Sequence, residues 1–239
     1  MINPVVDLHT HTLACGHAYS TVTEVIRAAA DKGLAGVGLT EHGIGYPGSV
    51  SWAYFNTYRD IPREMFGIRV YRGAEANFMN LDGSIDFTSE QLRKLDLVIV
   101  SCHTDCLKPG DSKEAYTDMI VRAMHQKEID IIGHPDNPLY PIDADRLARE
   151  AARLGKALEV NSSSPAARPG SEPQCREVLQ AAKKYGTLLS VGSDAHYHLK
   201  VGDFSYSLRM LQEADIPEEQ VVNSSMPRLE AFLKTHHDV

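Results

Sequence analysis

The sequence predicts an α/β protein, a distorted seven-stranded β/α barrel of the TIM-like kind. Short apolar segments alternate with amphipathic helical segments along the chain, a pattern typical of a parallel sheet. The apolar segments are rich in Val, Ile and Leu, as are strands buried on both faces. Seven such segments in 239 residues indicate a small barrel, and we expect a single domain over 1–239. An open doubly wound sheet is the alternative; it is disfavoured because no glycine-rich dinucleotide loop follows the first strand.

The elements follow one another in a regular order. The predicted strands are Val5–Leu8, Ala35–Thr40, Arg69–Ala74, Leu97–Ser101, Ile129–Gly133, Ala157–Val160 and Leu188–Gly192. Several helices carry end signals: Thr21 with Glu24 and Thr88 with Gln91 form capping boxes, and glycine follows three of the helices. The predicted helices span 21–33, 88–91, 112–125, 143–154, 171–185, 204–214 and 228–234.

Composition and charge exclude several classes of protein. Hydrophobic residues at 43% and charged residues at 23% are ordinary for a globular chain, so fibrous and disordered classes are excluded. A formal net charge of −8 disfavours a nucleic-acid surface, which usually needs a basic face. A small anionic substrate remains compatible with this charge, because bound divalent cations would supply a local positive field.

The sequence also indicates a compartment. The first twelve residues lack the basic and apolar regions of a secretory signal. No stretch approaches the roughly 18 apolar residues that a membrane span needs. The four cysteines do not form a disulfide framework. We therefore expect a cytoplasmic protein with no membrane association.

Histidine and acidic residues follow the predicted strands at their carboxyl ends. Six of the seven strands deliver such residues, and the seventh, Ala157–Val160, ends in Asn161 and three serines. Carboxyl ends of barrel strands converge on one face, where active sites are built. Judged singly, each histidine would be an ordinary core or loop residue; the shared position makes the set a predicted metal site. The candidates are His9, His11, His17, His42, Glu75, His103, His134, Asp194 and His196.

The kinds of ligand restrict the metal and the number of ions. Imidazole suits zinc, iron, nickel or manganese, whereas magnesium and calcium prefer oxygen ligands. Nine protein ligands exceed the needs of one ion and fit two or three, with a carboxylate as a bridge. His9 and His11 alternate along an extended segment, so both rings face the same side. His125, His198, His236 and His237 are expected outside the site, the last two in a frayed tail.

These motifs resemble the PHP (polymerase and histidinol phosphatase) superfamily of metal-dependent phosphoesterases. The resemblance covers nearly the whole chain and is strongest to the YcdX-like phosphatases. Its motifs are Asp7–His11, Glu41–Gly43, Gly73–Asn77, the His103 turn, Gly133–Pro135 and Gly192–His196, joined by His17–Thr21 and Asn161–Ser163. Glu41 departs from the usual Asp of its motif. A longer side chain there changes a contact behind the ligands without removing the metal.

The resemblance implies a trinuclear site, usually zinc, with manganese or iron as alternatives. Two ligand sets would share one carboxylate, and a third set would stand apart. His9, His11, Glu75 and Asp194 would hold the first ion and the attacking water; Glu75, His103 and His134 the second; His17, His42 and His196 the third.

The predicted reaction is hydrolysis of a small phosphate monoester by a metal-activated water. Arg168 lies in the loop after the sixth strand, where it could bind phosphate or remain a solvated loop residue. The aromatic loop Gly43–Pro62 could cover the site or pack over the barrel mouth. Neither Ser193 nor the serines after Asn161 have the surroundings of a nucleophile.

Three alternative functions remain open. A phosphodiesterase or nuclease could use the same ions, although the acidic charge and the absence of a basic domain disfavour it. An amidohydrolase acting on C–N bonds shares histidine pairs on barrel strands, but no strand-end lysine is present. A non-catalytic metal-binding accessory module is disfavoured by the complete set of ligands.

Overall fold

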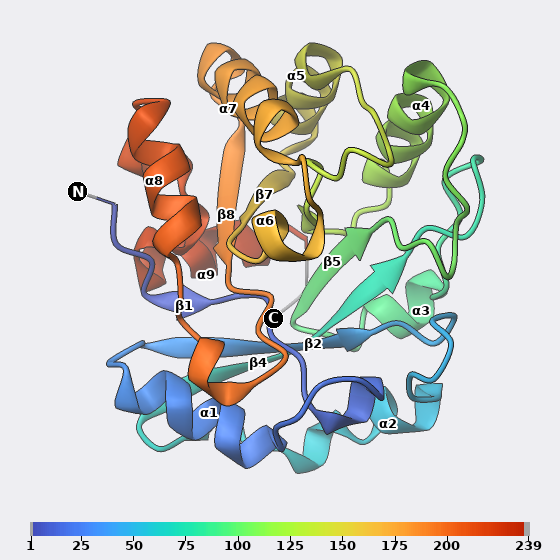
Figure 1. Cartoon of the computed structure of the whole chain (residues 1–239). Helices are drawn as coiled ribbons and strands as arrows, with labels where there is room; N and C mark the ends of the chain where they lie inside the picture. The colour runs from blue at the N-terminus through green and yellow to red at the C-terminus, as the bar shows by residue number, and fades with distance from the viewer. Residues whose placement is uncertain (1, 237–239) are drawn as a thin grey trace.

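The computed structural model, which describes residues 2–236, confirms the barrel (Figure 1). Its main sheet contains parallel strands that pair in chain order, with the helices outside them. These strands are β1 (Val6–Asp7), β2 (Gly36–His42), β4 (Ile68–Asn77), β5 (Leu97–Ser101), β6 (Ile131–Ile132), β7 (Ala157–Asn161) and β8 (Leu188–Gly192). All seven predicted strands are thus present, and their carboxyl ends lie at one end of the barrel.

Backbone hydrogen bonds join the two edges of the sheet beyond the ends of β1 and β8. The amide of Asp194 donates to the carbonyl of His9 at 2.8 Å, and the amide of His11 donates to the carbonyl of Ala195 at 2.9 Å. Thr10 and Ala195 form a parallel bridge there. Segments from the two ends of the chain are therefore held side by side at the mouth of the barrel.

The helices confirm most of the predicted end signals. They are α1 (Val22–Asp31), α2 (Trp52–Asn56), α3 (Ser89–Leu92), α4 (Lys113–Met124), α5 (Ala144–Leu154), α6 (Ser164–Ala167), α7 (Glu172–Tyr185), α8 (Ser205–Glu213) and α9 (Met226–Lys234). Both predicted capping boxes form, at Thr21 and at Thr88. Ser171 precedes α7 without a side-chain cap, so the capping role predicted for it is wrong.

One short strand and two short α-helices have no counterpart among the predicted elements, and the same holds for five 3-10 helices of three residues each among residues 2–236. Strand β3 (Glu64–Met65) pairs antiparallel with β4 through a tight turn at Phe66 and Gly67, both with positive φ. The helices α2 and α6 span only five and four residues. Such short segments have too few residues to show a periodic pattern.

Helix α9 covers the amino-terminal end of the barrel. Its Leu229, Phe232 and Leu233 pack with Val6 and Tyr71 in one apolar cluster. This packing extends past the helix, because the last described residue lies at its end and is buried. Among residues 2–236, no helix is both long enough and apolar enough to cross a membrane.

His236 corrects a further expectation. The residue was expected in a frayed tail, but only 5% of it is exposed. Its Nδ1 lies 2.8 Å from Asp130 Oδ1, a contact that fixes the end of α9. His237 lies outside the described residues.

The aromatic loop Gly43–Pro62 packs mainly into the core. Phe55 and Tyr58 are buried, and their rings contact one another with centroids 5.6 Å apart. Phe87 packs edge-on against Phe55 at 5.2 Å. Tyr46 is the member of this loop that stacks on a predicted ligand, His42, at a ring distance of 4.3 Å. The loop therefore packs over the barrel, and Tyr46 borders the site.

Candidate metal centre

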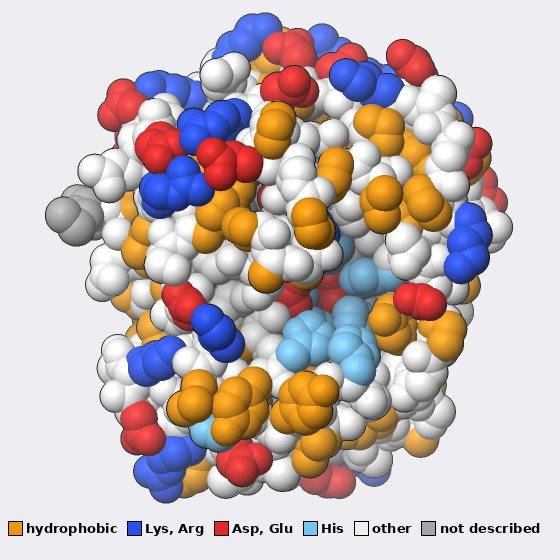
Figure 2. Space-filling model, viewed as in Figure 1, with side chains coloured by type: hydrophobic (Ala, Val, Ile, Leu, Met, Phe, Trp, Pro, Cys, Tyr) orange, Lys and Arg blue, Asp and Glu red, His pale blue; other side chains and the backbone are white. Residues whose placement is uncertain are grey.

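The predicted ligands meet at the carboxyl end of the strands. Figure 2 shows histidine side chains gathered in a hollow of this face, with carboxylates beside them. Most of the set is buried; His17 is exposed, and His103 and His196 are half-buried. The structure thus brings together His9, His11, His17, His42, Glu75, His103, His134, Asp194 and His196.

Glu75, near the end of β4, lies at the middle of the cluster. Its Oε1 is 2.9 Å from His134 Nε2 and 3.4 Å from His103 Nε2. Its Oε2 is 2.8 Å from His42 Nδ1. Because both oxygens face imidazole nitrogens from different strands, this carboxylate is placed to bridge two cations.

The two histidines after β1 face the same point, as their alternation predicts. Their Nε2 atoms are 3.1 Å apart. Asp194 Oδ1 lies 3.3 Å from His11 Nε2 and 3.7 Å from His9 Nε2. Donor atoms of His9, His11 and Glu75 all lie within 4.8 Å of one another. The spacing suits one ion bound by several residues.

A third group lies at the exposed rim. His17 Nε2 and His196 Nε2 are 3.0 Å apart, and the His17 and His42 rings stack at 5.1 Å. His11 is shared with this group, because its donor atoms lie within 4.8 Å of those of His42 and His196. Cys15 also approaches, with Sγ 3.9 Å from His17 Nδ1.

Glu159, on β7, is a functional candidate that the sequence reasoning missed. Its Oε1 lies 2.8 Å from His9 Nδ1, and its Oε2 accepts a hydrogen bond from the amide of His134 at 2.8 Å. A carboxylate on the far nitrogen of a ligand histidine fixes the ring and its tautomer. A Cβ on Gly192 would lie 2.4 Å from Glu159 Oε1, so glycine is needed for this approach. The available signal was a lone acid in the apolar run Ala157–Val160.

Asn77 and Asp86 also support the ligands from behind. Asn77 Oδ1 accepts from His103 Nδ1 at 2.7 Å. Asp86 accepts from the amide and the side-chain nitrogen of Asn77 at 2.8 and 2.6 Å. This leaves His103 Nε2 facing Glu75.

The carboxylate of Glu41 lies beside His11 and Cys15, with donor atoms of the three residues within 4.8 Å of one another. The same carboxylate accepts hydrogen bonds from the amide of Thr12 at 3.1 Å and from the Thr12 hydroxyl at 2.5 Å. Burial raises the pKa of Glu41 to about 7. This residue holds the loop after β1 in place behind the histidines.

Arg168 reaches the site, so the solvated-loop alternative is wrong. Only 10% of its side chain is exposed, and Nη2 lies 2.7 Å from Asp194 Oδ2. Asn161 donates to the same oxygen at 3.2 Å. His125 and His198 lie outside the cluster, as expected: His125 is exposed at the end of α4, and His198 contacts Ser20.

Two cluster residues have strained backbones. His134 and Asp194 have φ values of 30° and 54°, in the left-handed region that residues with a side chain rarely adopt. Both lie just past the end of a strand, where the chain turns toward its neighbours. Such strain concentrates at functional sites, where the surrounding contacts hold it.

The electrostatics of the cluster favour bound cations. Burial alone would raise the pKa of Glu75, but His103, His9 and His42 hold it well below its usual range. Burial lowers the pKa of His134 to about 4, so this imidazole is neutral near pH 7 and offers a lone pair. Burial and the neighbouring histidines likewise keep the pKa of His11 well below its usual value.

Several buried polar atoms in the cluster have no hydrogen-bond partner. They include Glu75 Oε2 and His42 Nδ1, which lie 2.8 Å apart but do not form a hydrogen bond, and His11 Nδ1. Buried polar atoms in proteins are usually paired. Here acceptor atoms face one another with too few protons between them, and cations would satisfy them. The residues present therefore fit a group of metal ions.

Fold and site together define a β/α barrel with a cluster of histidines and carboxylates at the carboxyl ends of its strands. In a comparison with known families, the PHP domain model matches residues 7–163 of this chain. A protein named probable phosphatase from Caldanaerobacter subterraneus subsp. tengcongensis is 41% identical over 96% of this chain and 91% of its own. A probable phosphatase from Acetivibrio thermocellus is 37% identical over 96% and 95%. The chain belongs to the PHP domain family.

Solved structures support the fold. One is the histidinol phosphate phosphatase of Lactococcus lactis, solved with zinc, L-histidinol and phosphate. It superposes with a TM-score of 0.63 at 18% identity and covers 87% of this chain and 93% of its own. A dihydroorotase superposes with a TM-score of 0.54 at 17% identity, covering 98% of this chain and 70% of its own. At these identities the similarity shows a shared barrel fold and nothing further.

Proposed function

We propose that this protein is a metal-dependent phosphatase that hydrolyses small phosphate monoesters. The observation that carries the proposal is Glu75, a buried carboxylate approached by His42, His103 and His134 from three other strand ends. Relatives named probable phosphatases, aligned over nearly the whole chain, support the same reaction class.

Three divalent ions, most simply zinc, are the proposed cofactors. Histidine-rich donor sets favour zinc, with manganese or iron as alternatives. The zinc-bound histidinol phosphate phosphatase of similar fold supports this choice. The proposed sets are His9, His11, Glu75 and Asp194 for the first ion, Glu75, His103 and His134 for the second, and His17, His42 and His196 for the third.

The chemistry divides between cations and protein. When bound, divalent ions would neutralise phosphoryl oxygens and lower the pKa of water, which supplies the nucleophile. Glu159 orients His9 through its Nδ1, and Asn77 orients His103. Arg168 holds Asp194 through Nη2, and its Nη1 lies 3.5 Å from Ser164 Oγ. The positive charge of this guanidinium beside the cluster can also attract a phosphate group.

The test combines metal analysis with two model substrates, p-nitrophenyl phosphate and its bis-ester. We expect two to three metal ions per chain and cleavage of the monoester at neutral pH. Replacement of Glu75 or His134 by alanine should abolish turnover and lower the metal content. The exposed His125→Ala variant is the control and should keep both.

Other outcomes would reject the proposal. Cleavage of only the bis-ester would indicate a phosphodiesterase. Metal ions without hydrolysis of either ester would favour an accessory module. Full activity of the Glu75→Ala or His134→Ala variant would contradict the proposed role of the cluster.

A further inference from the structure

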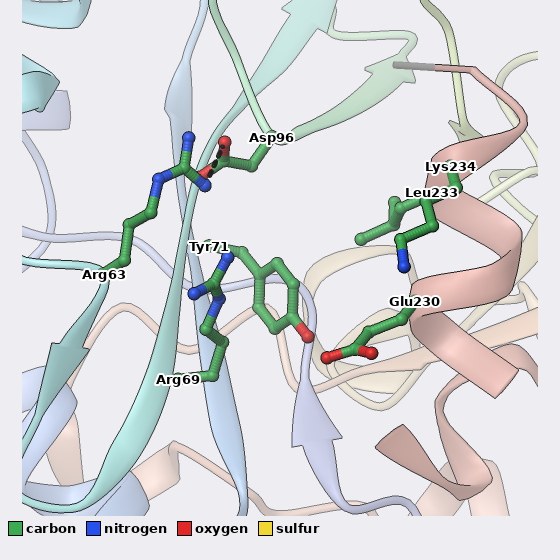
Figure 3. Close-up of a pocket in the computed structure, with 7 residues that line it drawn as sticks. All are labelled: Arg63, Arg69, Tyr71, Asp96, Glu230, Leu233 and Lys234. Carbon is green, nitrogen blue, oxygen red and sulfur yellow. Dashed lines mark ion pairs between the residues drawn. The ribbon is translucent and has the colours of Figure 1, made fainter. Parts of the chain in front are cut away.

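A second polar cavity lies at the opposite end of the barrel, where α9 covers the amino-terminal ends of the strands. We call it the basal cavity; its volume is about 230 Å³. It is lined by Arg63, Arg69, Tyr71, Asp96, Glu230, Leu233 and Lys234 (Figure 3). None of these residues belongs to the metal centre.

Two of the charged residues in the basal cavity are already paired. Asp96 Oδ1 lies 2.8 Å from Arg63, and Asp96 Oδ2 lies 3.3 Å from Arg72 Nε. The same Oδ2 accepts from the amide of Arg72 at 3.1 Å. Asp96 and Arg63 therefore form part of the wall and are not available to a ligand.

The remaining charges have no ion-pair partner among residues 2–236. Arg69 lies over the Tyr71 ring, with 5.8 Å between its guanidinium carbon and the ring centroid. Glu230 and Lys234 project from α9 into the same space (Figure 3). Two cations and one carboxylate thus face the cavity, Arg69 half-buried and Glu230 and Lys234 on its solvent-exposed side.

Tyr71 adds a polar group that points into the cavity. Only 3% of the residue is exposed, and its hydroxyl has no hydrogen-bond partner. Figure 3 shows this hydroxyl directed toward the carboxylate of Glu230. Leaving a buried hydroxyl unpaired costs about 1–3 kcal/mol, so a ligand that pairs it explains its presence.

These groups describe a ligand that carries both signs of charge. We propose that the basal cavity binds a small zwitterion of the α-amino-acid class. Arg69 and Lys234 bind the carboxylate, while Glu230 and the Tyr71 hydroxyl oxygen accept hydrogen bonds from the ammonium group. Leu233 and the Tyr71 ring offer apolar surface to the side chain. The volume is below the ~300–1,000 Å³ of pockets for drug-sized ligands, which suits a molecule of this size.

A simple anion fits the cavity less well. Arg69 and Lys234 would attract it, but the carboxylate of Glu230 would repel it. A simple cation would meet Arg69 and Lys234. The two charges of a zwitterion satisfy both groups at once, and this complementarity distinguishes the proposed class.

The experiment is calorimetric titration of the purified, metal-loaded protein with each standard amino acid. For the amino acid that binds, its amide and its deaminated acid are titrated next. We expect each analogue to bind about tenfold more weakly or worse, because each lacks one charge. Equally tight binding of the deaminated acid would overturn the zwitterion class, and absence of binding by every amino acid would overturn the site.

Variants locate the binding. Arg69→Gln and Glu230→Gln should each weaken binding by about tenfold or more, whereas Glu177→Gln, an exposed helix residue elsewhere, should not. Amino acids can also bind metal ions, so the titration is repeated after chelation. Binding that persists without metal supports the basal cavity; binding that disappears with the metal, or that survives both substitutions, overturns it.

The Tyr71→Phe variant distinguishes a role of the hydroxyl in ligand binding from a role in stability. Removal of an unpartnered hydroxyl should leave the melting temperature of the free protein unchanged or higher. The same substitution should weaken binding of the amino acid. A less stable variant with unchanged affinity would contradict the role of Tyr71. None of these results depends on phosphatase activity, so they separate this proposal from the proposed function.

Discussion

Glu159 shows at the scale of single residues how a buried acid can serve the site without being a ligand. Replacing it by glutamine keeps the shape but removes the charge that fixes His9 Nδ1. We expect metal affinity to fall about 10- to 100-fold, as for other carboxylates behind ligand histidines. Competition with a chromogenic chelator measures this directly. Glu150→Gln is the matched control, because Glu150 is half-buried on α5 and pairs with Arg153; equal metal retention by both variants would contradict the assigned role.

The sequence predicted the ligand positions well, because strand order alone brings strand ends together. His42 and Glu75 lie at or near the ends of their strands and His134 lies just past the end of another, so the prediction did not depend on any side-chain contact. Asn77 and Glu159 were missed for a different reason. Their roles depend on which side chain faces the far nitrogen of a histidine, and that depends on packing between strands.

At the scale of elements, the strands and long helices were predictable from periodicity and end signals. Helix α5 begins after Asp143 and ends at Gly155, which has a φ of 69°, as the sequence indicates. Strand β3 was not predicted, since Glu64 and Met65 do not lie in a run rich in Val, Ile or Leu and the strand exists only through pairing with β4. The positions of the short elements depend on tertiary contacts.

Lys156 links α5 to the segment before β6 and makes stability depend on pH. Its Nζ donates to the carbonyls of Gln126, Lys127 and Ile129 at 3.2, 2.9 and 2.7 Å. Burial lowers its pKa to about 8, partly offset by nearby acids. Between about pH 8 and 10 the unfolded chain therefore binds more protons at this lysine than the folded chain, so its contribution to stability rises with pH.

The prediction compares the wild type with Lys156→Met in urea unfolding across this pH range. The difference in unfolding free energy should move in favour of the wild type by about 1 kcal/mol for each pH unit between about pH 8 and 10, as the lysine loses its charge in the folded chain. Using the difference removes the effect of tyrosines and cysteines that titrate in the same range. A constant difference would show that Lys156 is not the group responsible.

For the whole molecule, Asn223 helps to close the barrel. Its Nδ2 donates to the carbonyls of Val6 and Val191 at 2.8 Å each, and its Oδ1 accepts from the amide of Val191 at 3.1 Å. The amide side chain thus joins β1 to β8 where the two strands do not pair directly. Asn223→Ala would leave buried backbone groups unpaired, and we expect a loss of about 2–4 kcal/mol in unfolding free energy. Asn80→Ala, on the surface, should change stability little; equal losses would contradict this role.

Metal removal tests how far the centre supports the entire fold. Glu75, Asp194 and Glu159 are buried and each lies beside His9, so metal ions would add positive charge to a site that already holds three carboxylates. Ions that bind the folded chain alone stabilise it by about 2.7 kcal/mol per site at a hundredfold excess over Kd. For a chain of this size each kcal/mol shifts Tm by about 2–4 °C, so chelation should lower Tm by about 5–10 °C or more, and added zinc should restore it. Scanning fluorimetry measures this change in Tm.

Two variants serve as test and control. The zinc-dependent rise in Tm should be largely absent in Glu75→Gln, because the bridging carboxylate couples the buried sites. It should be intact in His125→Ala, because this histidine at the end of α4 is not part of the cluster. If chelation leaves Tm unchanged, metal ions do not stabilise the fold. Protons would then balance the charges of the buried carboxylates.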